Sequence, residues 1–160
     1  MSSKTPDIGW DELDELYREV ILDHYRSPRN PVPLEAPDIE SEGFNPFCGD
    51  QIVVQLKLDG DGRVAQTSSR GEGCSISLAS VSMMTELLKG KTLNESEELR
   101  ERFRALMMGE ELSEEILLSM GDLEALQGVR KFPIRIKCAL LAWSALQDGI
   151  NEYRAQGSAQ

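Results

Sequence analysis

The chain has 160 residues, of which 40% are hydrophobic, and this length and composition suit one globular domain with a sizeable core. Its formal net charge of −11 at pH 7 argues against nucleic-acid binding, because an acidic surface repels the phosphate backbone. No run of about 18 apolar residues is present, so no membrane-spanning helix is expected. The charge suits either solubility alone or steering toward a basic partner.

The N-terminus and the cysteine count indicate the compartment. Residues 1–7 lack the apolar segment of a secretory signal, so we expect a cytoplasmic protein. The three cysteines, Cys48, Cys74 and Cys138, are an odd number and do not suit a disulfide framework in a reducing compartment. Metal binding or thiol chemistry explains them better.

The N-terminal half predicts one helix, a proline-rich connector and three strands. Apolar residues recur every three or four positions over 10–26, which is typical of one face of a helix. Residues 27–38 contain four of the seven prolines and are expected to be extended. Residues 39–44 suit a short edge strand. Alternating residues over 51–58 predict a half-buried strand. After a glycine-rich turn, residues 63–69 are expected to form a second strand antiparallel to it.

The C-terminal half predicts mainly helices. They are expected at residues 75–89, 94–108 and 113–120, and from Pro133 to near the C-terminus. Gly121 and Gly128 are expected to break the intervening region into short pieces. Cys74 then lies at a helix N-terminus and Cys138 lies in the first turns of the last helix, where a thiolate is favoured.

The segment at residues 45–50 contains a thiol and a carboxylate two positions apart, Cys48 and Asp50, on a loop with a glycine between them. Together with Cys74 and Cys138 they make four ligands, the number that a tetrahedral zinc ion takes. Thiolates favour zinc or an iron–sulfur unit over magnesium or calcium. Buried structural cysteines are the alternative. His24 is the only histidine, and a packing or capping role suits it better than metal ligation.

Several segments, in order along nearly the whole chain, resemble the SufU group of the IscU/NifU-like N-terminal domain family. They are YREVILDHY at 17–25, SPRN at 27–30, NPFCGD at 45–50, GEGCSIS at 71–77 and RIKCALLAW at 135–143. The resemblance implies an α+β fold of the SufE/IscU-like kind, with a small antiparallel β-sheet packed against several helices. It also implies that residues 1–160 form a single IscU/SufU-like domain, and we expect flexible ends at 1–9 and 156–160.

The family has two functional branches. Scaffold members of the IscU type carry a histidine directly before the last cysteine, where this chain has Lys137. The chain also has an extra helical stretch around residues 90–121. Both features are similar to SufU and imply a zinc-dependent sulfurtransferase, a persulfide carrier. It would take sulfur from a SufS-type cysteine desulfurase and serve downstream iron–sulfur assembly proteins, without binding nucleic acid or membranes.

The resemblance also implies roles for individual residues. Cys48, Asp50, Cys74 and Cys138 match the zinc ligands, Cys48 matches the sulfur acceptor, and Arg135 matches a supporting basic residue. No other cofactor is expected. Two alternatives stay open: an IscU-like scaffold that assembles a [2Fe–2S] cluster on the same cysteine and aspartate ligands, and a non-catalytic zinc-stabilised adaptor.

Overall fold

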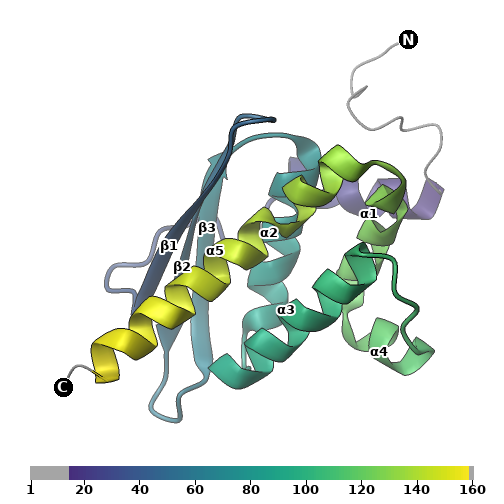
Figure 1. The fold of residues 1–160 in the computed structure, drawn as a ribbon. Helices are drawn as coiled ribbons and strands as arrows, with labels where there is room; N and C mark the ends of the chain where they lie inside the picture. Colours follow the sequence, from purple (N-terminus) through teal and green to yellow (C-terminus); the bar gives the residue numbers. More distant parts are fainter. Residues whose placement is uncertain (1–14, 159–160) are drawn as a thin grey trace.

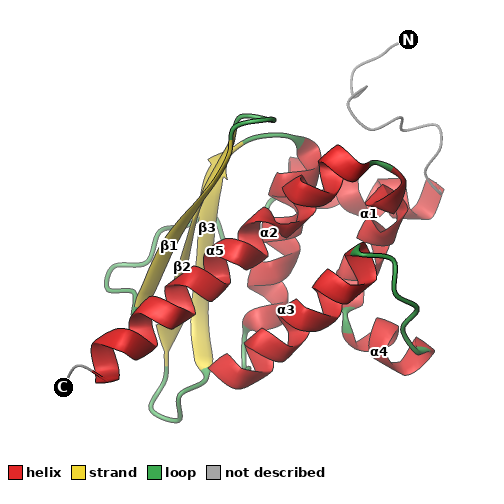
Figure 2. Cartoon of the chain, in the orientation of Figure 1, coloured by secondary structure: helices red, strands yellow, loops and turns green. Residues whose placement is uncertain are grey.

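A computed structural model describes residues 15–158 as a three-stranded sheet packed against helices, shown in Figures 1 and 2. This architecture confirms the expected α+β fold class. The elements in chain order are α1 (Glu15–Arg26), β1 (Ile39–Asn45), β2 (Asp50–Leu58), β3 (Val64–Glu72), α2 (Ser75–Leu88), α3 (Leu93–Met107), α4 (Glu114–Ser119), the 3-10 helix η3 (Gly121–Lys131) and α5 (Pro133–Ser158). Within the described range, no helix has the length and apolar character needed to span a bilayer.

The sheet has the order β1-β2-β3, and both pairs of neighbours are antiparallel. Ile52, Val54 and Leu56 of β2 are buried, as the alternation predicted. The helix α5 crosses this sheet diagonally (Figure 1) and packs on β1. Glycine makes the close approach possible, because a Cβ atom added at Gly149 would lie 2.7 Å from Cγ2 of Ile39.

The helix α2 is the centre of the helical layer, because it contacts α1, β3, η3 and α5. Nearly all of its residues are buried, so it lacks the polar face of a surface helix. Between α3 and α5, the rings of Phe103 and Trp143 pack with their centroids 5.4 Å apart. One core therefore joins the sheet to the helices.

A polar network around the buried side chains of His24 and Ser82 joins three of these elements, and we refer to its residues, His24, Ser82 and Asp122, as the His24 cluster. Nδ1 of His24 lies 2.8 Å from Oγ of Ser82, and Nε2 lies 2.8 Å from Oδ2 of Asp122. The backbone N–H of Arg29 also donates to Oγ of Ser82. His24 therefore has the packing role that its isolation in the sequence favours.

Some expected boundaries differ from the structure. The helix predicted over 10–26 is described only from residue 15, and residues 10–14, like the predicted flexible end at 1–9, lie outside the described range. The predicted break at Gly128 is wrong, because η3 continues through it to Lys131 and is tied to the core by buried apolar side chains. The helix α5 includes residues 156–158, and the expected flexibility of the C-terminal end stays a prediction.

Candidate metal centre

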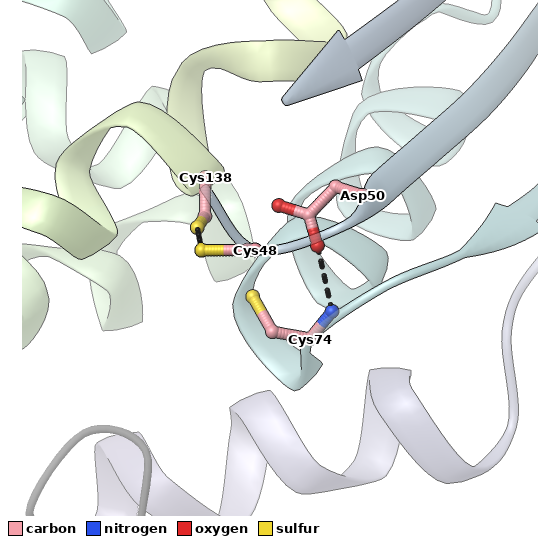
Figure 3. A group of neighbouring side chains, drawn as sticks. All are labelled: Cys48, Asp50, Cys74 and Cys138. Carbon is pink, nitrogen blue, oxygen red and sulfur yellow. Dashed lines mark hydrogen bonds between the residues drawn. The ribbon is translucent and has the colours of Figure 1, made fainter. Parts of the chain in front are cut away.

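The four candidate ligands come from three separate parts of the chain and meet at one end of the sheet. Their ligand atoms all lie within 4.8 Å of one another, and Figure 3 shows the side chains converging. We refer to Cys48, Asp50, Cys74 and Cys138 as the cysteine cluster. Asp50 and Cys138 are buried, whereas Cys48 and Cys74 are partly exposed. The cluster can therefore be reached from solvent on its Cys48 side.

Cys48 lies on the turn between β1 and β2. The side-chain oxygen of Asn45 accepts a hydrogen bond from the backbone N–H of Phe47 at 3.2 Å, which closes the first part of this turn. Gly49 then adopts φ +69°, a conformation that favours glycine, and returns the chain into β2 at Asp50. The turn thus places the thiol and the carboxylate on the same side of the hairpin end.

Cys74 is the N-cap residue of α2 and follows β3 by one glycine. Its backbone N–H donates to Oδ1 of Asp50 at 2.8 Å, which links the two chain segments directly (Figure 3). Gly73 allows this contact, because a Cβ atom added there would collide with Oδ1 of Asp50 and lie 2.8 Å from Oγ of Ser77. The side chain of Cys74 makes no capping hydrogen bond, which leaves its sulfur for the cluster.

Cys138 lies in the second turn of α5, and its sulfur is 3.0 Å from the sulfur of Cys48. One turn earlier, Arg135 donates from Nη1 to the sulfur of Cys48 at 2.9 Å and approaches the sulfur of Cys138 at 3.8 Å. The structure therefore brings a guanidinium group to the sulfur atoms of Cys48 and Cys138. Such a cationic donor favours negative charge on sulfur.

The thiols of Cys74 and Cys138 differ in acidity. The pKa of Cys74 is lowered to about 6, chiefly because its thiolate accepts a hydrogen bond from the thiol of Cys138. That same hydrogen bond, together with burial, raises the pKa of Cys138. Of these two thiols, Cys74 is therefore the more acidic.

Lys137 and Phe47 form the outer edge of the site. Nζ of Lys137 lies 5.2 Å from the ring centroid of Phe47, and both side chains are exposed. This geometry fits a cation–π contact at a solvent-exposed edge. Lys137 therefore faces solvent.

The structure places every sequence-predicted site residue. The four candidate ligands and Arg135 are brought together, whereas His24 belongs to the separate His24 cluster. One residue of the site was missed. Asn45 stands in the quoted motif without a role, although its side chain contacts both Asp50 and Cys138. An asparagine before a tight turn is a signal for a side-chain hydrogen bond to the turn.

Comparisons with known proteins identify relatives of the chain. The chain is 50% identical over 138 residues to the zinc-dependent sulfurtransferase SufU of Bacillus subtilis, covering 86% of this chain and 91% of that protein. It is 39% identical over 140 residues to the iron-sulfur cluster assembly scaffold protein IscU of Streptococcus pyogenes serotype M1, covering 87% and 85%.

A solved structure and a family model also match the chain. The crystal structure of FiSufU from Fervidobacterium islandicum, described as an iron-sulfur cluster assembly scaffold protein for the SUF system, superposes with a TM-score of 0.75 at 31% identity. It covers 82% of this chain and 93% of that chain. Residues 16–160 match the NifU-like N terminal domain, and the chain therefore belongs to the family of NifU-like N-terminal domains.

Proposed function

We propose that the chain accepts sulfur from the persulfide of a SufS-type cysteine desulfurase and passes it on for iron–sulfur cluster assembly, with zinc bound at the cysteine cluster. The convergence of four ligand atoms within 4.8 Å is the observation that supports this most directly. The 50% identity to a zinc-dependent sulfurtransferase supports the same function.

The cysteine cluster fits a zinc ion. Three thiolates and one carboxylate complete a tetrahedral set of four ligands. Zinc–sulfur bonds of about 2.3 Å separate the sulfur atoms of a tetrahedral site by about 3.8 Å. All the ligand atoms of the cluster lie within 4.8 Å of one another, and the 3.0 Å between the sulfur atoms of Cys48 and Cys138 would widen when zinc binds. A bound zinc ion would keep the thiols deprotonated and tolerate exchange of one ligand, because it has no preferred d-electron geometry.

Cys48 is the residue that we assign as sulfur acceptor. It lies on a turn, partly exposed, and can move without unwinding a helix. Its thiolate attacks the outer sulfur of the desulfurase persulfide, the sulfur–sulfur bond breaks, and the desulfurase cysteine leaves as a thiolate. Cys48 then carries the persulfide. Arg135, which donates to this sulfur at 2.9 Å, positions the thiolate and favours its charge.

The other three ligands belong to regular structure. Cys74 is the N-cap of α2, Cys138 lies within α5, and Asp50 begins β2, where its carboxylate accepts a hydrogen bond from the backbone N–H of Cys74. Moving any of them would disturb a helix or the sheet. We therefore assign them as the fixed part of the metal site.

The partner and the compartment are part of this proposal. A SufS-type cysteine desulfurase supplies the persulfide, and downstream iron–sulfur assembly proteins receive the sulfur. We assign a cytoplasmic location, since all three cysteines are free thiols and a reducing compartment keeps them so.

A [2Fe–2S] scaffold is the second candidate, favoured by the 39% identity to an IscU scaffold and by the same soft ligands. Lys137 argues against it, because its amine lies over Phe47 and adds no ligand to the cluster. A zinc-stabilised adaptor without chemistry is the third candidate. It would activate a desulfurase without ever carrying sulfur.

Metal content measured together with desulfurase turnover tests the proposal. We expect about one zinc ion per chain and faster cysteine turnover by a SufS-type desulfurase when the zinc-loaded protein is added. An anaerobically purified protein with iron, sulfide and visible charge-transfer absorbance would favour the scaffold. Undiminished desulfurase activation by Cys48→Ala would favour the adaptor, and protein that binds no zinc would refute the metal site.

A further inference from the structure

Asn45 is the last residue of β1, and it pairs in register with Asp50, the first residue of β2. Residues paired in this way project their side chains to the same face of the sheet. Asn45 is only 6% exposed, so its amide is enclosed at the end of the hairpin with the cysteine cluster. A buried amide needs hydrogen-bond partners, because an unpaired one destabilises the fold.

Among the described residues, the hydrogen-bond partners of this amide all belong to the site. Nδ2 donates to Oδ2 of Asp50 at 3.5 Å and to the sulfur of Cys138 at 3.6 Å. Oδ1 accepts from the backbone N–H of Phe47, next to Cys48, at 3.2 Å. An amide nitrogen has two hydrogens, so both donor contacts can form at once. One side chain thus reaches two ligands and the turn that bears a third.

We propose that Asn45 is a positioning residue of the metal centre, which orients Asp50 and Cys138 and restrains the turn bearing Cys48. This inference rests on the proposed zinc site. It adds a determinant of metal affinity that is not itself a ligand.

The carboxylate of Asp50 shows what this positioning achieves. Its Oδ1 accepts from the N–H of Cys74, and its Oδ2 accepts from Asn45. Both oxygens are therefore held from the protein side, and the orientation of the carboxylate is set before a metal ion arrives. Such outer contacts to ligands change metal affinity by roughly 10–100-fold.

The chemistry of the amide also suits the charge of the site. Three thiolates and one carboxylate carry four negative charges when all are ionised. A neutral amide donates to two of these groups without adding charge, and it does so at any pH. An aspartate at this position would instead add a fifth negative charge and could not donate when ionised. A neutral amide therefore suits this position better than a carboxylate.

Two variants separate the contacts of Asn45, and a third provides the control. Asn45→Ala removes all three hydrogen bonds. Asn45→Ser retains an oxygen that can accept from the N–H of Phe47, but it is too short to donate to Asp50 and Cys138. Gln55→Ala removes another buried amide of the same sheet, whose partners are Leu34 and Glu40, outside the site.

Zinc affinity by chelator competition and the absorption spectrum of the cobalt-substituted protein are the measurements. We expect a zinc affinity lowered by roughly 10–100-fold in both Asn45 variants, with altered cobalt ligand-field bands. In zinc-loaded protein, alkylation of Cys48 should become faster in Asn45→Ala than in Asn45→Ser, because only the latter keeps the turn closed. Gln55→Ala should lower the melting temperature and leave zinc affinity unchanged.

The outcomes separate this inference from the proposed function. Unchanged zinc affinity in Asn45→Ser, with zinc bound by the wild type, would overturn the positioning role alone. A drop of equal size in Gln55→Ala would also overturn it, because the effect would then reflect general stability. Absence of zinc binding in the wild type would refute the proposed metal site itself. Should Asn45→Ala not fold, Asn45→Ser still decides the question.

Discussion

The His24 cluster and the cysteine cluster are both polar, both largely enclosed, and both built from three separate elements. In the His24 cluster, each group has a matching partner: the N–H of Arg29 donates to Ser82, and the imidazole lies between Ser82 and Asp122. This pattern fits a ring that carries its proton on Nε2, accepts from the hydroxyl of Ser82 and donates to Asp122. The network is complete without any ligand.

The cysteine cluster has a different balance of hydrogen-bond acceptors and donors. Three sulfur atoms and a carboxylate meet within 4.8 Å, and they are acceptors once ionised. The protein donors that reach them come from Arg135, Asn45 and the N–H of Cys74. Convergent anionic ligands need a cation, whereas a paired network does not. Both clusters are polar and enclosed. What distinguishes the ligand site from the stabilising network is whether each acceptor has a hydrogen-bond donor within the protein.

The largest expected effect is the loss of sulfur acceptance in Cys48→Ala. The protein should stay folded, because the residue lies on a turn, while zinc binding weakens. Mass spectrometry of alkylated peptides after one turnover with a desulfurase and cysteine is the measurement, and Phe47→Ala is the matched control on the same turn. Persulfide found mainly on Cys74 or Cys138 of the wild type would contradict the assignment.

Removing the metal should strongly destabilise the protein. A ligand present at a thousandfold excess over its Kd stabilises the folded state by about 4 kcal/mol, which corresponds to roughly 8–16 °C in melting temperature for a chain of this size. Thermal melts with and without a chelator measure this. An unchanged melt in zinc-loaded protein would show that the cysteine cluster, like the His24 cluster, is complete without a cation.

His24→Ala should destabilise the protein by about 2–3 kcal/mol, because it leaves the buried hydroxyl of Ser82 without its acceptor. Zinc stoichiometry should not change, since the cluster is separate from the ligands. Denaturant unfolding and metal analysis are the measurements. Asp122→Asn, whose side chain is 57% exposed, is the milder control. A parallel loss of zinc would mean that the two clusters are coupled.

Gly73→Ala should weaken zinc binding by about 1–3 kcal/mol. A side chain at φ +155° is strained, and its Cβ would displace Asp50. We expect lower zinc affinity by chelator competition. Gly60→Ala is the control, because a Cβ atom there meets nothing within 4 Å. Equal zinc affinity in both variants would show that the contact between Cys74 and Asp50 does not shape the site.

The smallest expected signal is the ionisation of one thiol. In metal-free protein, thiolate absorbance in the ultraviolet should rise as pH passes about 6, because the hydrogen bond from Cys138 lowers the pKa of Cys74. Cys74→Ser should remove this step. A step that survives the substitution would assign the acidic thiol to another cysteine.

Much of the fold follows from local signals in the sequence. The alternation in β2 and the helices expected at 75–89 and 113–120 depend on residues within a few positions of one another, and the structure confirms them. The motif around Cys48, together with the two other cysteines, was also sufficient to nominate the candidate ligands. The continuity of η3 through Gly128 was not predictable, because buried contacts with other elements outweigh the low helix propensity of glycine.

The sequence by itself therefore determined which residues could bind a metal, because thiol and carboxylate chemistry is a property of the side chain. Only the tertiary structure decided that they meet, since Cys48 and Cys138 are 90 residues apart along the chain. It likewise gave His24 its partners, which are 58 and 98 residues away, and Asn45 its contact with Cys138. Contacts over such separations depend on packing of the whole core, which no local pattern encodes.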